Sequence, residues 1–151
     1  MALDPKMKDT IQWSAIYNGG ASVLEYLIGF AAYAYIFRLA GYGLDLGMLI
    51  SSAVNGIIAG AIVGFVLAKW YPQIMELNKK YLKNSLNSLF KLLFYPYAVG
   101  AILSVVLSLG AAFAVGTGPL VSIVGTLVVR YLYAKMLAAK VGQYYPATPT
   151  A

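Results

Sequence analysis

Two long stretches without a charged residue limit what this chain can fold into. Residues 46–68 contain no charge, and neither do residues 92–129. A helix rises about 1.5 Å per residue and the apolar core of a bilayer is about 30 Å thick, so the second stretch is too long for one crossing. The sequence VGTGP at 115–119 places two glycines and a proline in its middle. This pattern predicts two helices joined by a tight turn.

The remaining segments extend the helical pattern. Residues 11–38 are apolar apart from Glu25 and Arg38, and a glycine-rich turn follows them. Residues 73–91 place apolar side chains on one helical face and lysines on the other. This pattern predicts an amphipathic helix that begins at Pro72 and lies along a surface. Pro96 is expected to kink or interrupt the join to the next helix.

We therefore expect one all-α domain over residues 1–151. Its fold class is a hydrophobic four-helix bundle of two hairpins, built from membrane-type helices, with an extra basic amphipathic helix between the second and third helices. The helices are expected at about 11–38, 46–71, 73–91, 92–115 and 119–142. The tail 143–151 shows no packing pattern and is expected to be extended or mobile.

Composition argues against catalytic and metal chemistry. The chain has no Cys and no His, which removes thiolate and imidazole ligands and the nucleophile and base pairs that use them. Five acids remain, and no two of them lie three or four residues apart. Only 11% of the residues are charged, against about 25% in soluble proteins, so water is not the main solvent of this chain. We expect no enzymatic activity, no cofactor, no metal site and no small-molecule substrate.

Positive charge gathers on one side of the expected topology. Four alternating helices put the N-terminus, residues 72–91 and the C-terminus on that side. Ten of the eleven Lys and Arg residues fall there, opposed by Asp4, Asp9 and Glu76. The residues expected to contact a nucleic acid or an anionic surface are Lys69, Lys79, Lys80, Lys83, Lys91, Lys135 and Lys140.

Two interpretations of this asymmetry remain open. Lysines can mark the cytoplasmic loops of a membrane protein, according to the positive-inside rule. Alternatively, the basic side faces a polyanion, either anionic lipid headgroups or the phosphate backbone of a nucleic acid. Nothing in the lysine spacing is suited to reading base edges, so a nucleic-acid contact would be independent of sequence.

Small residues recur every four positions along the second helix, within SSAVNGIIAGAIVGF at 51–65. Such stripes allow another helix backbone to approach closely. The first row consists of Ser52, Gly56, Gly60, Gly64 and Ala68. The second row, on the third long helix, consists of Gly100, Ser104, Ser108 and Ala112. We expect close helix crossings here, within one subunit or between subunits; the alternative is that Gly and Ala are simply common in apolar helices.

Glu25 and Arg130 are the charged residues expected inside the apolar region. Both lie roughly 16 to 20 Å from the same turn side of the helices. A buried carboxylate is costly alone and tolerable when paired. We therefore expect a Glu25–Arg130 ion pair, within or between subunits, with a proton or ion relay as the functional alternative.

The chain is very hydrophobic, helical, basic and free of cysteine, and in this overall character it resembles the major capsid proteins of large tailed spindle-shaped viruses that infect archaea. The resemblance covers most of the chain. It implies a homopolymer that forms a helical tube or shell around double-stranded DNA, with the lysine-rich side toward the DNA. It also implies a place in the virion, and in the host membrane before assembly. The competing interpretation is a four-span protein of the cell inner membrane, either an accessory subunit of a larger complex or an oligomeric channel or transporter.

Overall fold

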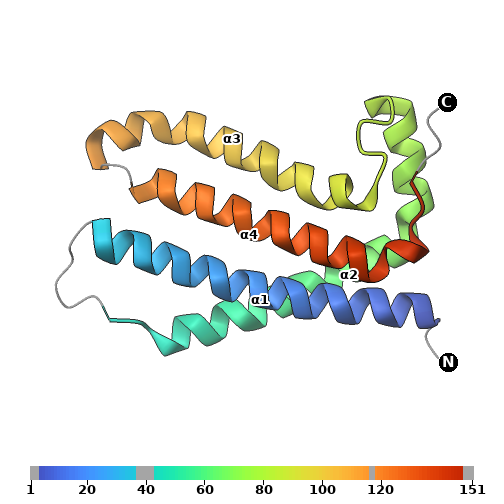
Figure 1. Ribbon diagram of the computed structural model, residues 1–151, viewed down its shortest axis with the longest axis horizontal. Coiled ribbons are helices and arrows are strands. Elements are labelled where there is room, and N and C mark those ends of the chain that lie inside the picture. The colour runs from blue at the N-terminus through green and yellow to red at the C-terminus, as the bar shows by residue number, and fades with distance from the viewer. Residues whose placement is uncertain (1–3, 37–42, 116–117, 148–151) are drawn as a thin grey trace.

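The computed structural model describes residues 4–36, 43–115 and 118–147, which are all-α. These residues form four long helices, as the sequence predicts, and Figure 1 shows their arrangement. They are α1 (Pro5–Ile36), α2 (Leu46–Leu82), α3 (Leu89–Val115) and α4 (Gly118–Val141), and a single 3-10 turn, η1 (Gly142–Tyr144), follows α4.

The ends of α2 follow from local hydrogen bonding. Asp45 caps its N-terminus, and its carboxylate accepts hydrogen bonds from Gly47 N at 2.7 Å and Met48 N at 3.2 Å. Lys83 ends the helix in the left-handed conformation, with φ 48° and ψ 46°, and its N–H donates to the carbonyl of Asn78. This bond satisfies a carbonyl that the helix end leaves free.

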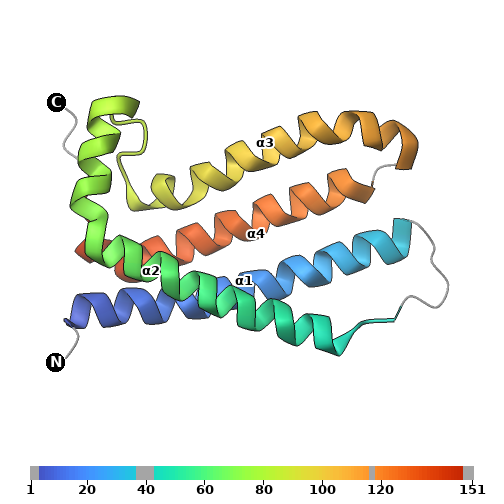
Figure 2. The same cartoon turned by 180° about the vertical axis from the view of Figure 1, so that it is seen from behind.

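The prediction of a separate amphipathic helix at residues 73–91 is wrong. Residues 73–82 continue α2 through Pro72, residues 83–88 form a turn, and α3 begins at Leu89. An internal proline removes one backbone hydrogen bond and crowds the preceding turn, which bends a helix without necessarily ending it. Tyr71 and Met75, on either side of Pro72, are both buried in the core, so packing holds the two parts of α2 together. Figure 2 shows that α2 turns in this region, so that residues 73–82 run across the end of the other helices. We call residues 73–82 the α2 arm.

Pro96 also lies inside a helix, so it does not interrupt the join before α3. The N-terminal helix is longer than expected and begins at Pro5, a residue suited to the first helical position because its missing N–H would be unpaired there anyway.

The four helices form a row in the order α2, α1, α4, α3. Neighbours in this row are antiparallel, and α1 packs on α2 and on α4 while α4 packs on α3 (Figures 1 and 2). The outer members, α2 and α3, have at most marginal contact through the residues described. The two hairpins are therefore joined through α1 and α4, which leaves a more open arrangement than a closed four-helix bundle.

The apolar core lies mainly toward the end of the row that holds both termini. It includes Leu67 and Tyr71 of α2, Leu93 of α3 and Leu137 and Val141 of α4. Elsewhere many large apolar side chains are exposed, such as Ile62 of α2, Leu107 of α3 and Val124 of α4. These side chains require an apolar cover that the described residues do not supply.

Three described helices are long and apolar enough to cross a membrane, judged by length and composition. They are α2 over Leu46–Leu82, α3 over Leu89–Leu107 and α4 over Leu120–Tyr144. In their apolar segments only 11 to 22% of the residues are buried, so the cover must come from lipid or from other chains. This finding suggests membrane association.

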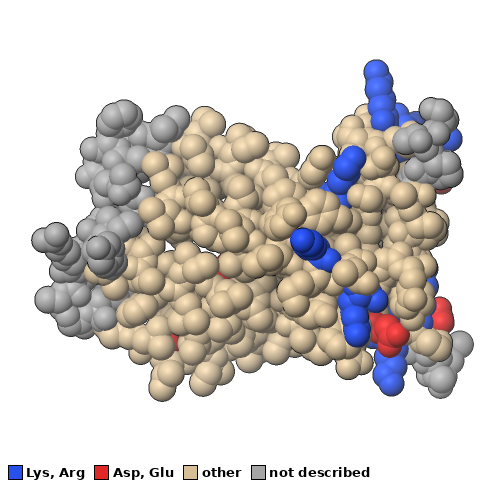
Figure 3. All heavy atoms as spheres, viewed as in Figure 1, with Lys and Arg blue, Asp and Glu red and all other residues tan. Residues whose placement is uncertain are grey.

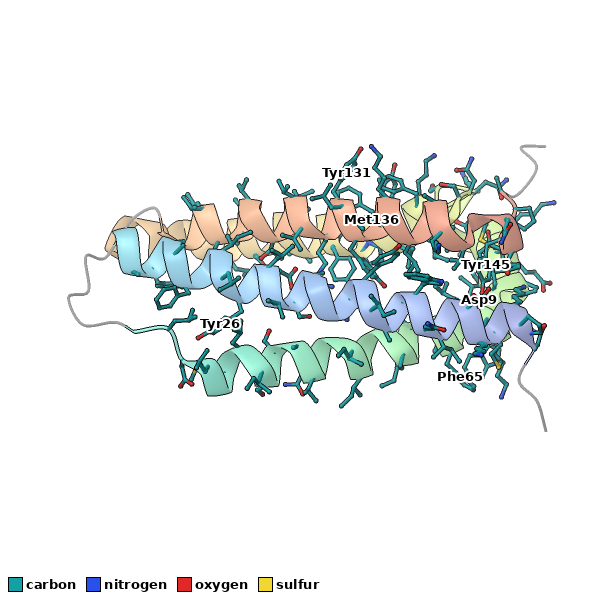
Figure 4. All side chains as sticks on the ribbon, turned by 60° about the horizontal axis from the view of Figure 1, so that its bottom comes forward. Asp9, Tyr26, Phe65, Tyr131, Met136 and Tyr145 are labelled. Carbon is teal, nitrogen blue, oxygen red and sulfur yellow. The ribbon has the colours of Figure 1, made fainter. Side chains whose placement is uncertain are left out.

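The tail is docked as far as Pro146, which corrects the expectation that residues 143–151 are extended or mobile over this part. Tyr145 is buried, and its hydroxyl lies 2.7 Å from Thr10 Oγ1. Tyr71 Oη donates to the carbonyl of Pro146 at 2.9 Å. Figure 4 shows Asp9 and Tyr145 at the end where α1 begins, and Asp9 accepts a hydrogen bond from Tyr144 at 3.1 Å. Residues 148–151 lie outside the described part of the chain.

Alkaline pH is expected to weaken this docking. Burial raises the pKa of the Tyr145 phenol, and Asp4 adds to the rise, above the value of about 10 that an unfolded chain has. The stability that this raised pKa provides is fully present below about pH 10 and is lost as the pH rises through the folded-state pKa. The free energy of unfolding, measured at several pH values above 9, should fall as the pH rises. The fall per pH unit should be smaller in Tyr145→Phe. An equal slope in both proteins would contradict the assignment to Tyr145.

Candidate functional site

The glycine stripe of α2 is filled by α1 of the same chain. Gly56, Gly60 and Gly64 are buried. A Cβ added to Gly64 would lie 2.7 Å from the Cα of Ile11, and one added to Gly60 would lie 2.8 Å from the Cα of Ala15. No side chain fits at these distances, so the two backbones meet because the residues are glycines. The stripe is therefore used for an intrachain crossing.

The ends of the first row behave differently from its centre. Ser52 extends the crossing with a hydrogen bond from its Oγ to the carbonyl of Ser22 at 2.9 Å. Ala68, at the other end, is half-buried.

The second row, on α3, is not closely packed by a helix of this chain where it is described. Gly100 and Ser104 are exposed, and a Cβ added to Gly100 would meet nothing within 4 Å. Both residues border a shallow cavity of about 290 Å³ that Ser122 and Thr126 of α4 also line. The side chains of Ser108 and Ala112 lie outside those described. The described part of this row is therefore exposed beside a shallow cavity between α3 and α4.

Glu25 of α1 and Arg130 of α4 form the expected ion pair, within one chain. Arg130 Nε lies 2.6 Å from one carboxylate oxygen of Glu25, and Nη2 lies 2.5 Å from the other. The side chains are only 11% and 18% exposed for Arg130 and Glu25. The guanidinium also lies 4.7 Å from the ring centroid of Tyr97, where the ring face favours a cation. The two parallel hydrogen bonds pair both charges in a poorly solvated position.

Asn18 connects the ion pair to the glycine stripe. Its Nδ2 donates to the carbonyl of Gly56 at 2.7 Å, and its Oδ1 accepts from Nη1 of Arg130. Because Asn18 is buried, both halves of its amide need these partners. One network therefore links α2, α1 and α4 across the centre of the row.

A polar groove lies beside this network, where α2 and α3 diverge. Its volume is about 710 Å³. It is lined by the network itself and by polar residues of α1 and α2, namely Ser22, Tyr26, Ser51, Ser52 and Asn55. Tyr26, labelled in Figure 4, spans α1 and the start of α2 by donating to the carbonyl of Asp45 at 3.2 Å.

Acidic groups are scarce in the lining of this groove. Glu25 is the one acid that lines it, and Arg130 already engages both carboxylate oxygens. A relay between carboxylates would need a second acid, and none of the other four acids lines the groove. In the described residues, no group of three or more His, Cys, Asp or Glu residues could hold a metal ion.

The described lysines lie together at the end of the row that holds the termini and the α2 arm, whereas Arg130 lies at the centre of the row. Figure 3 shows the blue Lys and Arg side chains on that half of the visible face. The lysines predicted to make anionic contacts are exposed except for Lys91, which is half-buried. Several pair with aromatic rings: Lys69 Nζ lies 4.8 Å from the Trp70 ring, and Lys140 Nζ lies 4.3 Å from the Trp13 ring. Lysines beside Trp and Tyr are typical of a membrane or polyanion interface.

Sequence reasoning missed a row of polar residues on α1. Thr10 and Ser14 are fully buried, and their hydroxyls lie within hydrogen-bonding distance of Tyr145 and Tyr133, at 2.7 and 3.3 Å. The row runs Thr10, Ser14, Asn18, Ser22 and Glu25. Its spacing of four, four, four and three residues is a helical-face signal that was present in the sequence.

Comparison with models of protein families, with curated proteins and with solved structures gives no match. The functional interpretation therefore depends on the geometry above.

Proposed function

We propose that this protein is a structural subunit that assembles with copies of itself, in the manner of the spindle-virus capsid proteins that its sequence resembles. The observation that carries the proposal is the division of the surface. Large apolar side chains remain exposed along three membrane-length helices, while the described lysines gather at one end (Figure 3). Neighbouring copies would cover the apolar sides, and the basic end would face a polyanion.

The row of helices offers a route for such assembly. Its two outer members, α2 and α3, expose different faces, and the α3 face includes the unfilled positions Gly100 and Ser104. A contact between the α2 edge of one copy and the α3 edge of the next would join two different surfaces. Contacts of this kind generate rings or open helical polymers, because each copy keeps a free edge.

Double-stranded DNA is the polyanion implied by the resemblance. Lysine ammonium groups act as point charges toward phosphates, so the contact would not depend on base sequence. The resemblance also implies that the protein resides in the host membrane before assembly, and the three membrane-length helices support this part of the proposal.

Assembly is tested by removing detergent from purified protein with and without linear DNA. We expect regular tubes or shells in negative-stain images, with enclosed DNA protected from nuclease. A stable monomer in detergent that gives neither particles nor protected DNA on detergent removal would contradict the proposal.

Removing three lysines is expected to weaken DNA enclosure without preventing assembly. The triple variant of Lys69, Lys135 and Lys140 to Gln should lower the slope of log affinity against log salt by up to about 2.7, because each lost phosphate contact contributes about 0.9. The matched variant with Arg at the same positions should keep the wild-type slope. Equal slopes in the Gln and Arg variants, measured by nuclease protection over a salt series, would place these lysines away from DNA.

An integral membrane protein remains the second candidate. It is favoured by the lysine and aromatic pairs at the basic end, which match a headgroup region as well as a DNA surface. In this form the protein would be an accessory subunit or an oligomeric channel or transporter, with the polar groove as its internal cavity. Co-purification of a detergent-bound monomer with other membrane subunits would favour this candidate.

A further inference from the structure

The α2 arm and the start of α3 enclose an apolar cavity that the proposed function does not use. Its volume is about 440 Å³, within the range of ligand sites. The arm supplies Ile74, Leu77, Tyr81 and Leu82, the turn supplies Leu86, and α3 supplies Leu92. The wall is almost wholly hydrocarbon, which favours an acyl chain.

Asn78 is the one amide side chain in this lining, and it is only 3% exposed. Its Oδ1 accepts a hydrogen bond from Leu86 N at 3.1 Å, which fixes the orientation of the amide. Its Nδ2 is buried and has no hydrogen-bond partner among the residues that the structure describes. A buried amide donor without a partner is unfavourable, so an acceptor oxygen supplied by a ligand would be stabilised here.

Three lysines lie close in sequence to the residues that line this cavity. Lys79, Lys80 and Lys83 are exposed at the C-terminal end of the arm. Lys80 Nζ lies 5.1 Å from the ring centroid of Tyr81, a residue that lines the cavity. Glu76 is the one acid on the arm. The surroundings favour a ligand with an anionic head.

We propose that this cavity binds one anionic phospholipid. Part of an acyl chain lies along the leucine wall, an ester or phosphate oxygen accepts from Asn78 Nδ2, and the phosphate is held near Lys80 and Lys83. The arm runs across the end of the helix row (Figure 2), the place that headgroups would occupy around membrane-length helices. A free phosphate would leave the apolar wall unused, and a neutral lipid would leave the lysines unused. The site is compatible with either candidate function, because it concerns a lipid bound to the single chain.

Native mass spectrometry of the purified protein in neutral detergent tests the proposal. We expect phosphatidylglycerol to be retained at least tenfold better than phosphatidylcholine with the same acyl chains. Glycerol phosphate, which has the headgroup chemistry without the chains, should not displace it. Equal retention of the two lipids, or displacement by glycerol phosphate, would overturn the proposal.

A variant of Asn78 with a matched control tests whether the lipid binds in this cavity. Asn78→Asp keeps the acceptor for Leu86 N but replaces the free donor with an anionic oxygen, and it should lower phosphatidylglycerol retention at least tenfold. Asn87→Asp adds the same charge to the neighbouring turn outside the cavity lining and should have less than a twofold effect.

Variants of the lysines test the site independently. They leave Asn78 unchanged, so a folding defect at that buried residue cannot affect the result. Lys80→Gln with Lys83→Gln should lower retention at least fivefold, whereas Lys135→Gln with Lys140→Gln removes the same charge from α4 and should have less than a twofold effect. Equal losses in the two double variants would show a general attraction to the basic end and would overturn the site.

Discussion

Gly60→Leu is expected to open the crossing of α1 and α2 and to destabilise the protein by more than about 3 kcal/mol. Even a Cβ at this position would lie 2.8 Å from the Cα of Ala15 and from the Cβ of Asn18. The obstacle includes backbone, which cannot rotate away as a side chain can. Separating the helices also breaks the hydrogen bond from Asn18 to the carbonyl of Gly56. Unfolding by denaturant in mild detergent, followed by circular dichroism, measures the loss.

Gly20→Leu is the matched control, because nothing lies within 4 Å of a Cβ added there and the residue is exposed on α1. Replacing a helical glycine normally favours the helix by up to about 1 kcal/mol, so this variant should be neutral or stabilised. Gly60→Ala should fall between the two leucine variants. If Gly60→Leu and Gly20→Leu were equally stable, the glycine stripe would not be the crossing point of α1 and α2.

The helices themselves could be predicted because their sequence signals are long and strong. Runs without charge and the glycine and proline breaks near 115–119 predict four apolar helices. The described residues form four long helices, and three of them are apolar and long enough to cross a membrane. The pairing of Glu25 with Arg130 could also be predicted, because two isolated charges at similar depth in an apolar region have few other partners.

Tertiary packing decided the features that the sequence did not reveal. A proline usually marks a helix start or a break, yet Tyr71 and Met75 are buried on either side of Pro72 and keep α2 continuous. Tyr145 has no periodic partner in the tail, and its burial depends on Thr10, which lies far away in the sequence. The partner of the glycine stripe was undetermined for the same reason, since a bare helix face does not specify which helix will cover it.

Arg130→Met is expected to destabilise the protein by about 3–5 kcal/mol, because it leaves the carboxylate of Glu25 in a poorly solvated position without its partner. It also leaves Asn18 Oδ1 without its charged donor. The double variant Glu25→Leu with Arg130→Met removes both charges and should recover most of the loss, since buried pairs are often replaceable by apolar side chains of similar volume. Unfolding in mild detergent measures all three proteins and yields the coupling energy between the two sites.

Lys135→Met removes an exposed charge from the same helix and should change stability by less than about 0.5 kcal/mol. This control separates loss of the pair from loss of any cation on α4. Additive losses in the double variant would mean that the two side chains do not interact, and a neutral Arg130→Met would mean that water reaches the carboxylate freely. A large coupling energy between Glu25 and Arg130 would mean that this ion pair helps to hold the two hairpins together, because the hairpins contact each other through α1 and α4. The polar groove beside it would then be a consequence of holding the hairpins at that contact while α2 and α3 stay apart.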